Sequence, residues 1–228
     1  MSLINFKNFK NLTQLKNKFK VIERIEDAGL IENWAAVHLI FYRNLSYNEN
    51  SILHLAMIRR VENKNDPWSG HYAFPGGGVN MGERLREASV RETKEEIGLK
   101  LPVSSYLGEF YRIQVHFDGK PAKLAISAHA SIIEGRGVGL PPLDPCPIEV
   151  DEAFWFPLGD LLSSDSIDYR EFHFSKMSKK LPCISFDGHL IWGLSYMIFR
   201  EFLIQWEVLS GHDNRLAIGD YLPGYHYK

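Results

Sequence analysis

The amino-acid sequence predicts an α/β (α+β) fold in which a mixed sheet lies between helices within one domain. Two observations predict it. Short apolar runs bounded by turn residues, typical of strands, alternate with segments typical of helices. The chain of 228 residues also contains no internal repeat and no low-complexity tract. We therefore expect one domain over residues 31–210, an N-terminal extension over 1–30 and a C-terminal tail over 211–228.

The first twenty residues contain five lysines and no acidic residue, with apolar side chains at mostly helical spacing. This pattern predicts a short basic amphipathic helix. Such a helix could pack on its own domain or on a partner subunit, or contact an anionic membrane surface. We favour the first alternative.

The remaining elements are predicted from apolar runs and from the turn or capping residues that bound them. A helix is expected over residues 83–97, with Gly98 as its C-terminal stop. A strongly apolar segment, 189–207, predicts a buried helix. A hairpin is expected around Asp118 and Gly119. Strands are expected at 34–42, 52–58, 71–74, 105–117 and 122–133, and residues 152–162 predict a strand followed by a short helix.

Composition excludes several classes of protein. The net charge of −2 indicates no nucleic-acid partner. No apolar stretch approaches the roughly 20 residues of a membrane span, so we expect no stable membrane insertion, and the first residues do not resemble a secretory signal. Cys146 and Cys183 are the only cysteines and form no CxxC pattern. A reducing, cytoplasmic setting is the expectation.

Three glutamates, Glu92, Glu95 and Glu96, fall within an arc of roughly 100° on the predicted helix. Like charges at this spacing repel each other. Arg91 and Lys94 are expected to point away from them. The cluster is either a solvated face or a site for a hard divalent cation, which takes oxygen ligands. The glycine-rich turn directly before the helix favours the cation.

Residues 77–99, GGVNMGERLREASVRETKEEIGL, resemble the signature of the Nudix hydrolase family, the Nudix box. Only Thr93 departs from the pattern, at a position where an aliphatic residue is usual. Threonine is β-branched and its methyl group can still pack, so we expect an effect on packing rather than on chemistry. The matching positions are Gly77, Glu83, Arg91, Glu92, Glu95, Glu96, Gly98 and Leu99.

The resemblance implies a Nudix fold, an α/β/α sandwich, that binds Mg²⁺ or Mn²⁺ against a substrate diphosphate. Glu92 and Glu96 would then be the principal metal ligands. Glu95 would join them directly or through water, and the carbonyl of Gly76 is a further candidate ligand. Arg91 would orient Glu92 through a charge-assisted hydrogen bond, with Glu83 supporting the cluster from outside.

The implied reaction is attack of water on one phosphorus of a diphosphate linkage. The group that accepts the proton is left open. One alternative is Glu95 or Glu96 within the box. The other is a carboxylate of a later loop, where Glu149, Asp151 and Glu152 are candidates.

Residues outside the box resemble the coenzyme A pyrophosphatase group of the family. LAMIRR followed by GHYAFPGGG matches at Gly70 and at 74–77, and EVDEAFWFPLGDLL and LIWGLSYMIF match further along. The fit is incomplete, because Asp66 stands where that group has a second arginine. The resemblance places Arg59, Arg60, Phe74 and Gly77 at the substrate.

The same resemblance leaves several side chains open. Arg59, Arg60 and Arg112 are candidates to bind the 3′-phosphate of coenzyme A, although exposed arginines at strand ends are equally consistent with solvation. Trp68, Tyr72 and Phe110 could stack on a base or belong to the core.

The expected function is therefore hydrolysis of coenzyme A or an acyl derivative. One alternative is another nucleoside diphosphate derivative: ADP-ribose, NADH or a dinucleoside polyphosphate. A non-catalytic nucleotide sensor is less consistent with the intact box, and a purely structural domain would not require the carboxylate cluster. A homodimer is expected from the resemblance alone.

Overall fold

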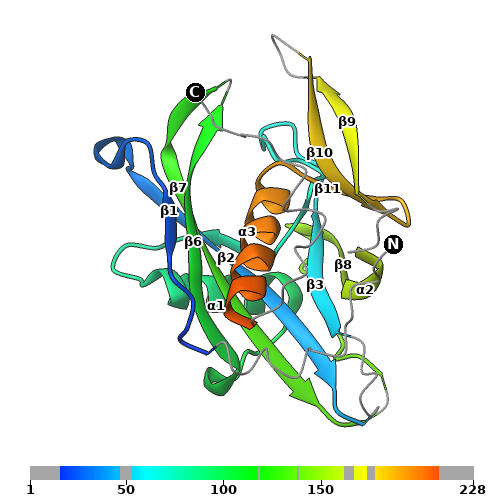
Figure 1. Ribbon diagram of the computed structural model, residues 1–228. Coiled ribbons are helices and arrows are strands. Elements are labelled where there is room, and N and C mark those ends of the chain that lie inside the picture. The colour runs from blue at the N-terminus through cyan, green and yellow to red at the C-terminus, as the bar shows by residue number, and fades with distance from the viewer. Residues whose placement is uncertain are drawn as a thin grey trace.

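The computed structural model describes residues 16–46, 53–117, 119–137, 139–161, 167–173 and 178–210 (Figure 1). A mixed sheet has the strand order β1-β6-β7-β2-β3-β4, with β5 added on β2 and β8 added on β3. The β1–β6 and β2–β7 pairs are parallel and the other pairs are antiparallel. Its strands are β1 Ile22–Arg24, β2 Asn33–Asn44, β3 Leu53–Arg60, β4 Tyr72–Ala73, β5 Gly76–Gly78, β6 Tyr106–Phe117, β7 Lys120–Gly135 and β8 Val150–Pro157.

A second, three-stranded antiparallel sheet is formed by β9 (Ile167–His173), β10 (Ser178–Phe186) and β11 (His189–Trp192). We call these strands the arm. The helices are α1 (Leu85–Ile97), the short α2 (Leu158–Leu161) and α3 (Gly193–Ser210), and two short 3₁₀ turns lie at Ala28–Leu30 and Val103–Ser105. Among the described residues, no helix is long and apolar enough to cross a membrane.

The two faces of the main sheet carry separate apolar clusters, because side chains alternate along each strand. Phe41 of β2 stacks on Phe202 of α3, with ring centroids 4.7 Å apart. Its neighbour Ile40 belongs to the cluster that contains Ile97 of α1 on the opposite face. Figure 1 shows α3 in front of the sheet and α1 behind it. The α/β/α arrangement expected from the sequence is confirmed.

The predicted helix over 83–97 is confirmed as α1, which begins at Leu85. Gly98 ends it in the left-handed conformation, with φ of 68°, and donates its N–H to the Lys94 carbonyl. This is the C-terminal stop that glycine provides without a steric penalty.

The predicted helix over 189–207 was wrong at its start. Residues 189–192 form β11, and α3 begins only at Gly193. The cause lies just upstream, where Asp187 and Gly188 both have positive φ, 47° and 80°. Two such residues form the tight turn that joins β10 to β11 as a hairpin.

Most of the basic helix expected at the N-terminus falls on residues 1–15, outside the described part, as does the tail 211–228. Where the chain is described, residues 16–18 form a turn and β1 follows, in parallel register with β6. Phe19 packs between Phe110 and Phe202. This segment is therefore attached to the main sheet through β1.

Candidate active site

Helix α1 holds the glutamate cluster against the sheet through a buried face that is partly polar. Ser89 and Thr93 are fully buried on it. Thr93 Oγ1 donates to the Ser89 carbonyl at 2.7 Å, and Ser89 Oγ lies 3.1 Å from Nδ1 of the buried His38 on β2. The departure from the family pattern at Thr93 is thus accommodated, since its hydroxyl has a local acceptor.

Glycines bring the backbone of β5 within contact of two carboxylates. The Gly76 N–H donates to Glu96 Oε2 at 2.8 Å. A Cβ added at Gly77 would lie 2.5 Å from the carboxyl carbon of Glu92, so only glycine leaves room for that carboxylate. The N–H and C=O of one strand residue point to the same side. The Gly76 carbonyl therefore also points away from β2.

Glu96 is 1% exposed, and burial raises its pKa to about 8. The Gly76 N–H and the Arg60 guanidinium oppose this shift, whereas Glu92 and Glu149 reinforce it. Burial likewise raises the pKa of Glu92, against the effect of Arg91. Both carboxylates thus have too little positive charge nearby to favour their ionised forms, which is the deficit that a bound cation removes.

These residues fit a divalent cation only as part of a mixed ligand set. Within the described ranges, no group of three or more His, Cys, Asp or Glu side chains is arranged to hold a metal ion. Mg²⁺ commonly binds through one or two carboxylates and completes its shell with waters and substrate phosphates. Glu92, Glu96 and the Gly76 carbonyl match that requirement.

The prediction that Arg91 points away from the glutamates was wrong. Its guanidinium donates to Glu92 Oε1 at 2.7 Å and to Glu95 Oε2 at 2.8 Å. It also donates to both carboxylate oxygens of Glu83, at 2.8 and 3.0 Å, and to the Gly78 carbonyl. Angular position on a helix ignores the length of the arginine side chain, which here extends to its neighbours. Arg91 thus fixes the position of Glu92, as a charge-assisted hydrogen bond requires.

The candidate proton acceptors differ in their surroundings. Glu95 is exposed and bound to Arg91. Glu149 is exposed, and its charge raises the pKa of both Glu92 and Glu96, so it faces the cluster. Asp151 instead accepts a hydrogen bond from Arg59 at 2.9 Å, and Glu152 lies 3.9 Å from His189. Among the three loop carboxylates, Glu149 is the one that the structure brings to the site.

A cavity of about 1300 Å³ borders β5 on the face of the sheet that α3 covers. Its lining includes three of the residues that the sequence placed at the substrate: Arg60, Phe74 and Gly77. Arg59 does not line it and is held by Asp151 and Glu62. Arg59 and Arg60 separate because successive strand residues face opposite sides and a bulge falls between them.

The structure also shows where the other side chains left open by the sequence lie. Trp68 lines the cavity, whereas Phe110 is fully buried in the core and Tyr72 packs against Phe154 and His189. Arg112 lies outside the lining and pairs with Glu109 and Glu23.

Asp66, which departs from the coenzyme A pyrophosphatase pattern, holds the cavity arginine. Arg60 donates to Asp66 Oδ2 through Nε at 3.0 Å and through a terminal nitrogen at 2.7 Å. Burial raises the pKa of Asp66, but the N–H of Trp68 and the Arg60 guanidinium lower it by more, so the net shift is downward. At the position where the coenzyme A pyrophosphatase group has a second arginine, this chain therefore has an aspartate that holds Arg60 in place.

Sequence reasoning missed the contribution of the arm and of α3 to the cavity. The cavity lining includes residues of all three elements: Lys179, Leu181 and Pro182 of β10, Trp192 of β11, and Ser195 and Arg200 of α3. The Asp-Gly pair at 187–188 was the available signal, because it marks a hairpin in a segment otherwise typical of a helix.

The raised pKa of Glu96 predicts how the metal-free protein responds to pH. Its folded-state pKa, about 8, exceeds the unfolded value near 4.5, so the folded state retains the proton longer. The free energy of unfolding should therefore fall as pH rises from about 5 to 8, by at most about 1.4 kcal/mol per pH unit. Melting temperatures measured with EDTA or with millimolar Mg²⁺ across this range test it. Mg²⁺ should stabilise more at pH 8 than at pH 5, and Glu96→Gln should remove most of that difference. An equal effect of Mg²⁺ at both pH values would contradict the prediction.

Comparison with known proteins agrees with this geometry. The NUDIX domain family matches residues 36–175, more than half of the chain. Mitochondrial coenzyme A diphosphatase NUDT8 of Homo sapiens is 30% identical over 158 residues, which cover 65% of this chain and 60% of that protein. ADP-ribose pyrophosphatase of Methanocaldococcus jannaschii is 50% identical over 53 residues, 23% of this chain and 31% of that protein.

The chain thus spans less than two thirds of the length of either relative. Among solved structures, a MutT/nudix family protein from Enterococcus faecalis aligns over 83% of this chain and 62% of its own, with a TM-score of 0.45 and 16% identity. The extent of the domain match decides the assignment: the chain belongs to the Nudix family.

Proposed function

We propose that this protein hydrolyses a diphosphate linkage in a nucleoside diphosphate derivative, with coenzyme A or an acyl derivative as the favoured substrate. One observation carries the proposal. The glycine backbone of β5 lines the cavity and also contacts the carboxylates of Glu92 and Glu96. A diphosphate in the cavity would therefore lie next to the carboxylates.

Glu92, Glu96 and the Gly76 carbonyl would hold Mg²⁺ or Mn²⁺. When bound, such an ion neutralises phosphate charge and lowers the pKa of water. Arg91 keeps Glu92 in place and, through Glu83 and Gly78, ties helix α1 to the loop before it. Water attacks one phosphorus, the bridging P–O bond breaks, and the second phosphate leaves.

Glu149 is the proposed acceptor of the proton from the attacking water. It is exposed, so it can exchange that proton with solvent, and it faces Glu92 and Glu96 without an ion pair among the described residues. Glu95 is the second candidate, although its carboxylate already accepts a hydrogen bond from Arg91.

The choice of coenzyme A is supported by the relative named as a coenzyme A diphosphatase and by the segments upstream and downstream of the box. A second candidate substrate is ADP-ribose, because the shorter but more similar match is named as an ADP-ribose pyrophosphatase. A homodimer and a cytoplasmic location stay predictions.

A parallel assay tests the proposal. Coenzyme A, ADP-ribose, NADH and a dinucleoside polyphosphate are each offered with Mg²⁺ or Mn²⁺, and products are identified by mass spectrometry. We expect coenzyme A to give 3′,5′-ADP and 4′-phosphopantetheine fastest. Faster cleavage of another compound would identify that compound as the preferred substrate. If none is cleaved, the alternative of a non-catalytic nucleotide sensor would be favoured.

A further inference from the structure

Two arginines on the cavity wall form no ion pair with the acidic side chains that the structure describes. Arg24, at the end of β1, and Arg200, in α3, both line the cavity. Neither forms an ion pair with a carboxylate of the described ranges, whereas Arg60 in the same lining is held by Asp66. Glu23, which precedes Arg24 in β1, is paired with Arg112, and Arg112 does not line the cavity. Glu23, Glu26 and Glu201 also line the cavity, but none of them forms an ion pair with Arg24 or Arg200. A guanidinium group without a carboxylate partner is suited to bind an anion.

Arg24 and Arg200 share the cavity lining with Tyr111 of β6, the strand that pairs with β1. Burial and the neighbouring Glu201 carboxylate raise the pKa of Tyr111 to about 12, while both arginines act in the opposite direction. Glu201 Oε1 accepts from Gln205 at 3.2 Å.

Arg200 also contains an unsatisfied donor. Its Nε is buried, and no acceptor among the described residues receives its hydrogen. A buried donor of this kind is normally paired in folded proteins. A phosphate oxygen is a suitable acceptor, because guanidinium binds phosphate through two parallel N–H···O bonds.

The position of Tyr111 relative to β5 follows from strand register. Tyr111 pairs with Ala128 of β7, Ala128 with Val37 of β2, and Val37 with Gly76 of β5. These four residues form one row across the sheet. Three strand spacings separate Tyr111 from Gly76 by about 14 Å between backbones. The arginines therefore lie in the same cavity as the glycine strand but apart from it.

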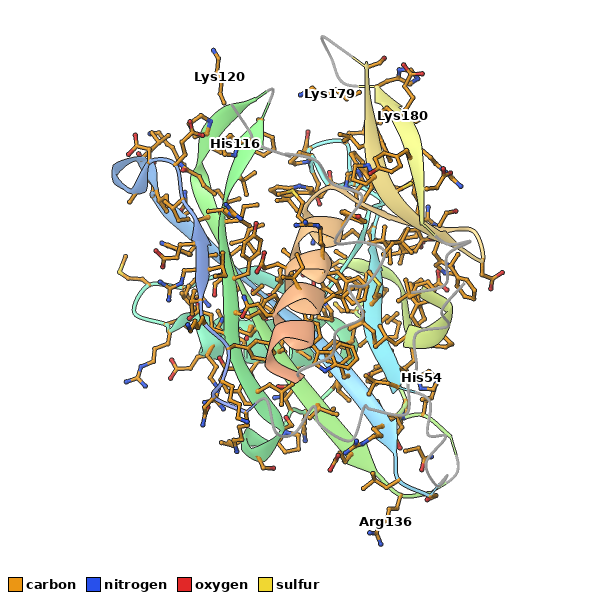
Figure 2. The ribbon with its side chains drawn as sticks, in the orientation of Figure 1. His54, His116, Lys120, Arg136, Lys179 and Lys180 are labelled. Atoms are coloured by element: carbon orange, nitrogen blue, oxygen red, sulfur yellow. The ribbon has the colours of Figure 1, made fainter. Side chains whose placement is uncertain are left out.

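A third cation comes from the arm. Lys179 of β10 lines the cavity and forms no ion pair with the described residues. In Figure 2 its side chain extends from β10 toward the side on which the β6–β7 hairpin and His116 lie. His116, also in the lining, is paired with Glu26, which leaves Lys179 available.

We infer that Arg24 and Arg200, assisted by Lys179, form a subsite for a phosphate that the substrate carries in addition to the diphosphate that is cut. This inference rests on the proposed function and narrows the substrate class to nucleoside diphosphate derivatives with a further phosphate. That phosphate can be attached to the ribose, as in coenzyme A, or belong to a longer polyphosphate chain.

Paired substrates test the inference. Each pair differs only in the additional phosphate: coenzyme A against 3′-dephospho-coenzyme A, and diadenosine triphosphate against diadenosine diphosphate. The readout is the ratio of kcat/KM within each pair for the wild type, Arg24→Gln, Arg200→Gln and Lys179→Met. Arg136→Gln is the matched control, since Arg136 is exposed and lies at the opposite end of the molecule from Lys179 (Figure 2).

We expect the wild type to favour the phosphorylated member of one pair, and Arg24→Gln and Arg200→Gln each to lower that ratio by about tenfold or more through KM. Lys179→Met should lower it less, because an exposed ammonium binds more weakly. The pair that responds identifies the source of the phosphate. Ratios that are equal in the wild type and both arginine variants would overturn the inference while leaving the proposed function intact. Failure of the wild type to cut any of the four substrates would instead remove the proposed function. Arg24 is exposed, so the test stands even if Arg200→Gln does not fold.

Discussion

Replacing Glu96 by glutamine is expected to lower kcat/KM by about a hundredfold or more while the fold is kept. Glutamine has nearly the same volume, and its amide oxygen can still accept the Gly76 N–H that Glu96 binds at 2.8 Å. What disappears is a charge at a position where burial already raises the pKa of the carboxyl group to about 8. The metal-free variant should therefore be at least as stable as the wild type, with a weaker dependence of rate on Mg²⁺.

Initial rates across a Mg²⁺ titration, with melting temperatures of the same samples, measure both parts of this expectation. Glu87→Gln is the matched control on the same helix. Glu87 is exposed and accepts the Arg84 N–H, a bond that glutamine can keep. A Glu96→Gln enzyme with near-wild-type rate would rule out Glu96 as a metal ligand.

The second large effect is expected for Gly77→Ala, which should lower kcat/KM by about tenfold or more. The added methyl group would lie within 2.5–2.7 Å of all three carboxyl atoms of Glu92. Glu92 must then move and lose its 2.7 Å contact with Arg91. Gly77 does not have a positive φ, so alanine fits its backbone and little stability should be lost.

The neighbouring glycine provides the control for this change. An added Cβ at Gly78 meets no atom within 4 Å, and the carbonyl that accepts from Arg91 remains. Gly78→Ala should therefore stay close to the wild-type rate. The kcat/KM of each variant is measured at saturating and at limiting Mg²⁺. An equal loss of kcat/KM in Gly77→Ala and Gly78→Ala would mean that the Gly77 effect does not arise from displacement of Glu92.

The elements and carboxylates of the box could be predicted because their relations are local. Helix α1 and its stop at Gly98 depend on residues within a few turns of each other. The closeness of Glu92 and Glu96 follows from their spacing of four. Arg91 was misjudged even here, because which of several neighbours a long flexible side chain contacts depends on charges several residues away, such as Glu83.

The cavity could not be predicted, because its walls come from segments far apart in the chain. Arg24, Lys179 and Arg200 meet in one lining only through the pairing of β1 with β6 and the folding of the arm. The apolar run at 189–207 also masks β11, the last strand of the arm, since periodicity alone does not separate a buried strand from the start of a buried helix. Arg59 and Arg60 were equivalent in sequence, and only the folded chain shows that Arg60 lines the cavity whereas Arg59 does not.

The triglycine strand β5 contacts two different parts of the site. Gly76–Gly78 line the cavity, and Gly76 and Gly77 also contact the carboxylates of α1. The carboxylates proposed to hold the metal lie on α1, whereas much of the rest of the cavity lining comes from α3 and the arm. Substitutions in the arm or α3 should therefore change which molecule fits the cavity while leaving Glu92 and Glu96 in place, whereas a side chain at Gly77 would displace Glu92 itself.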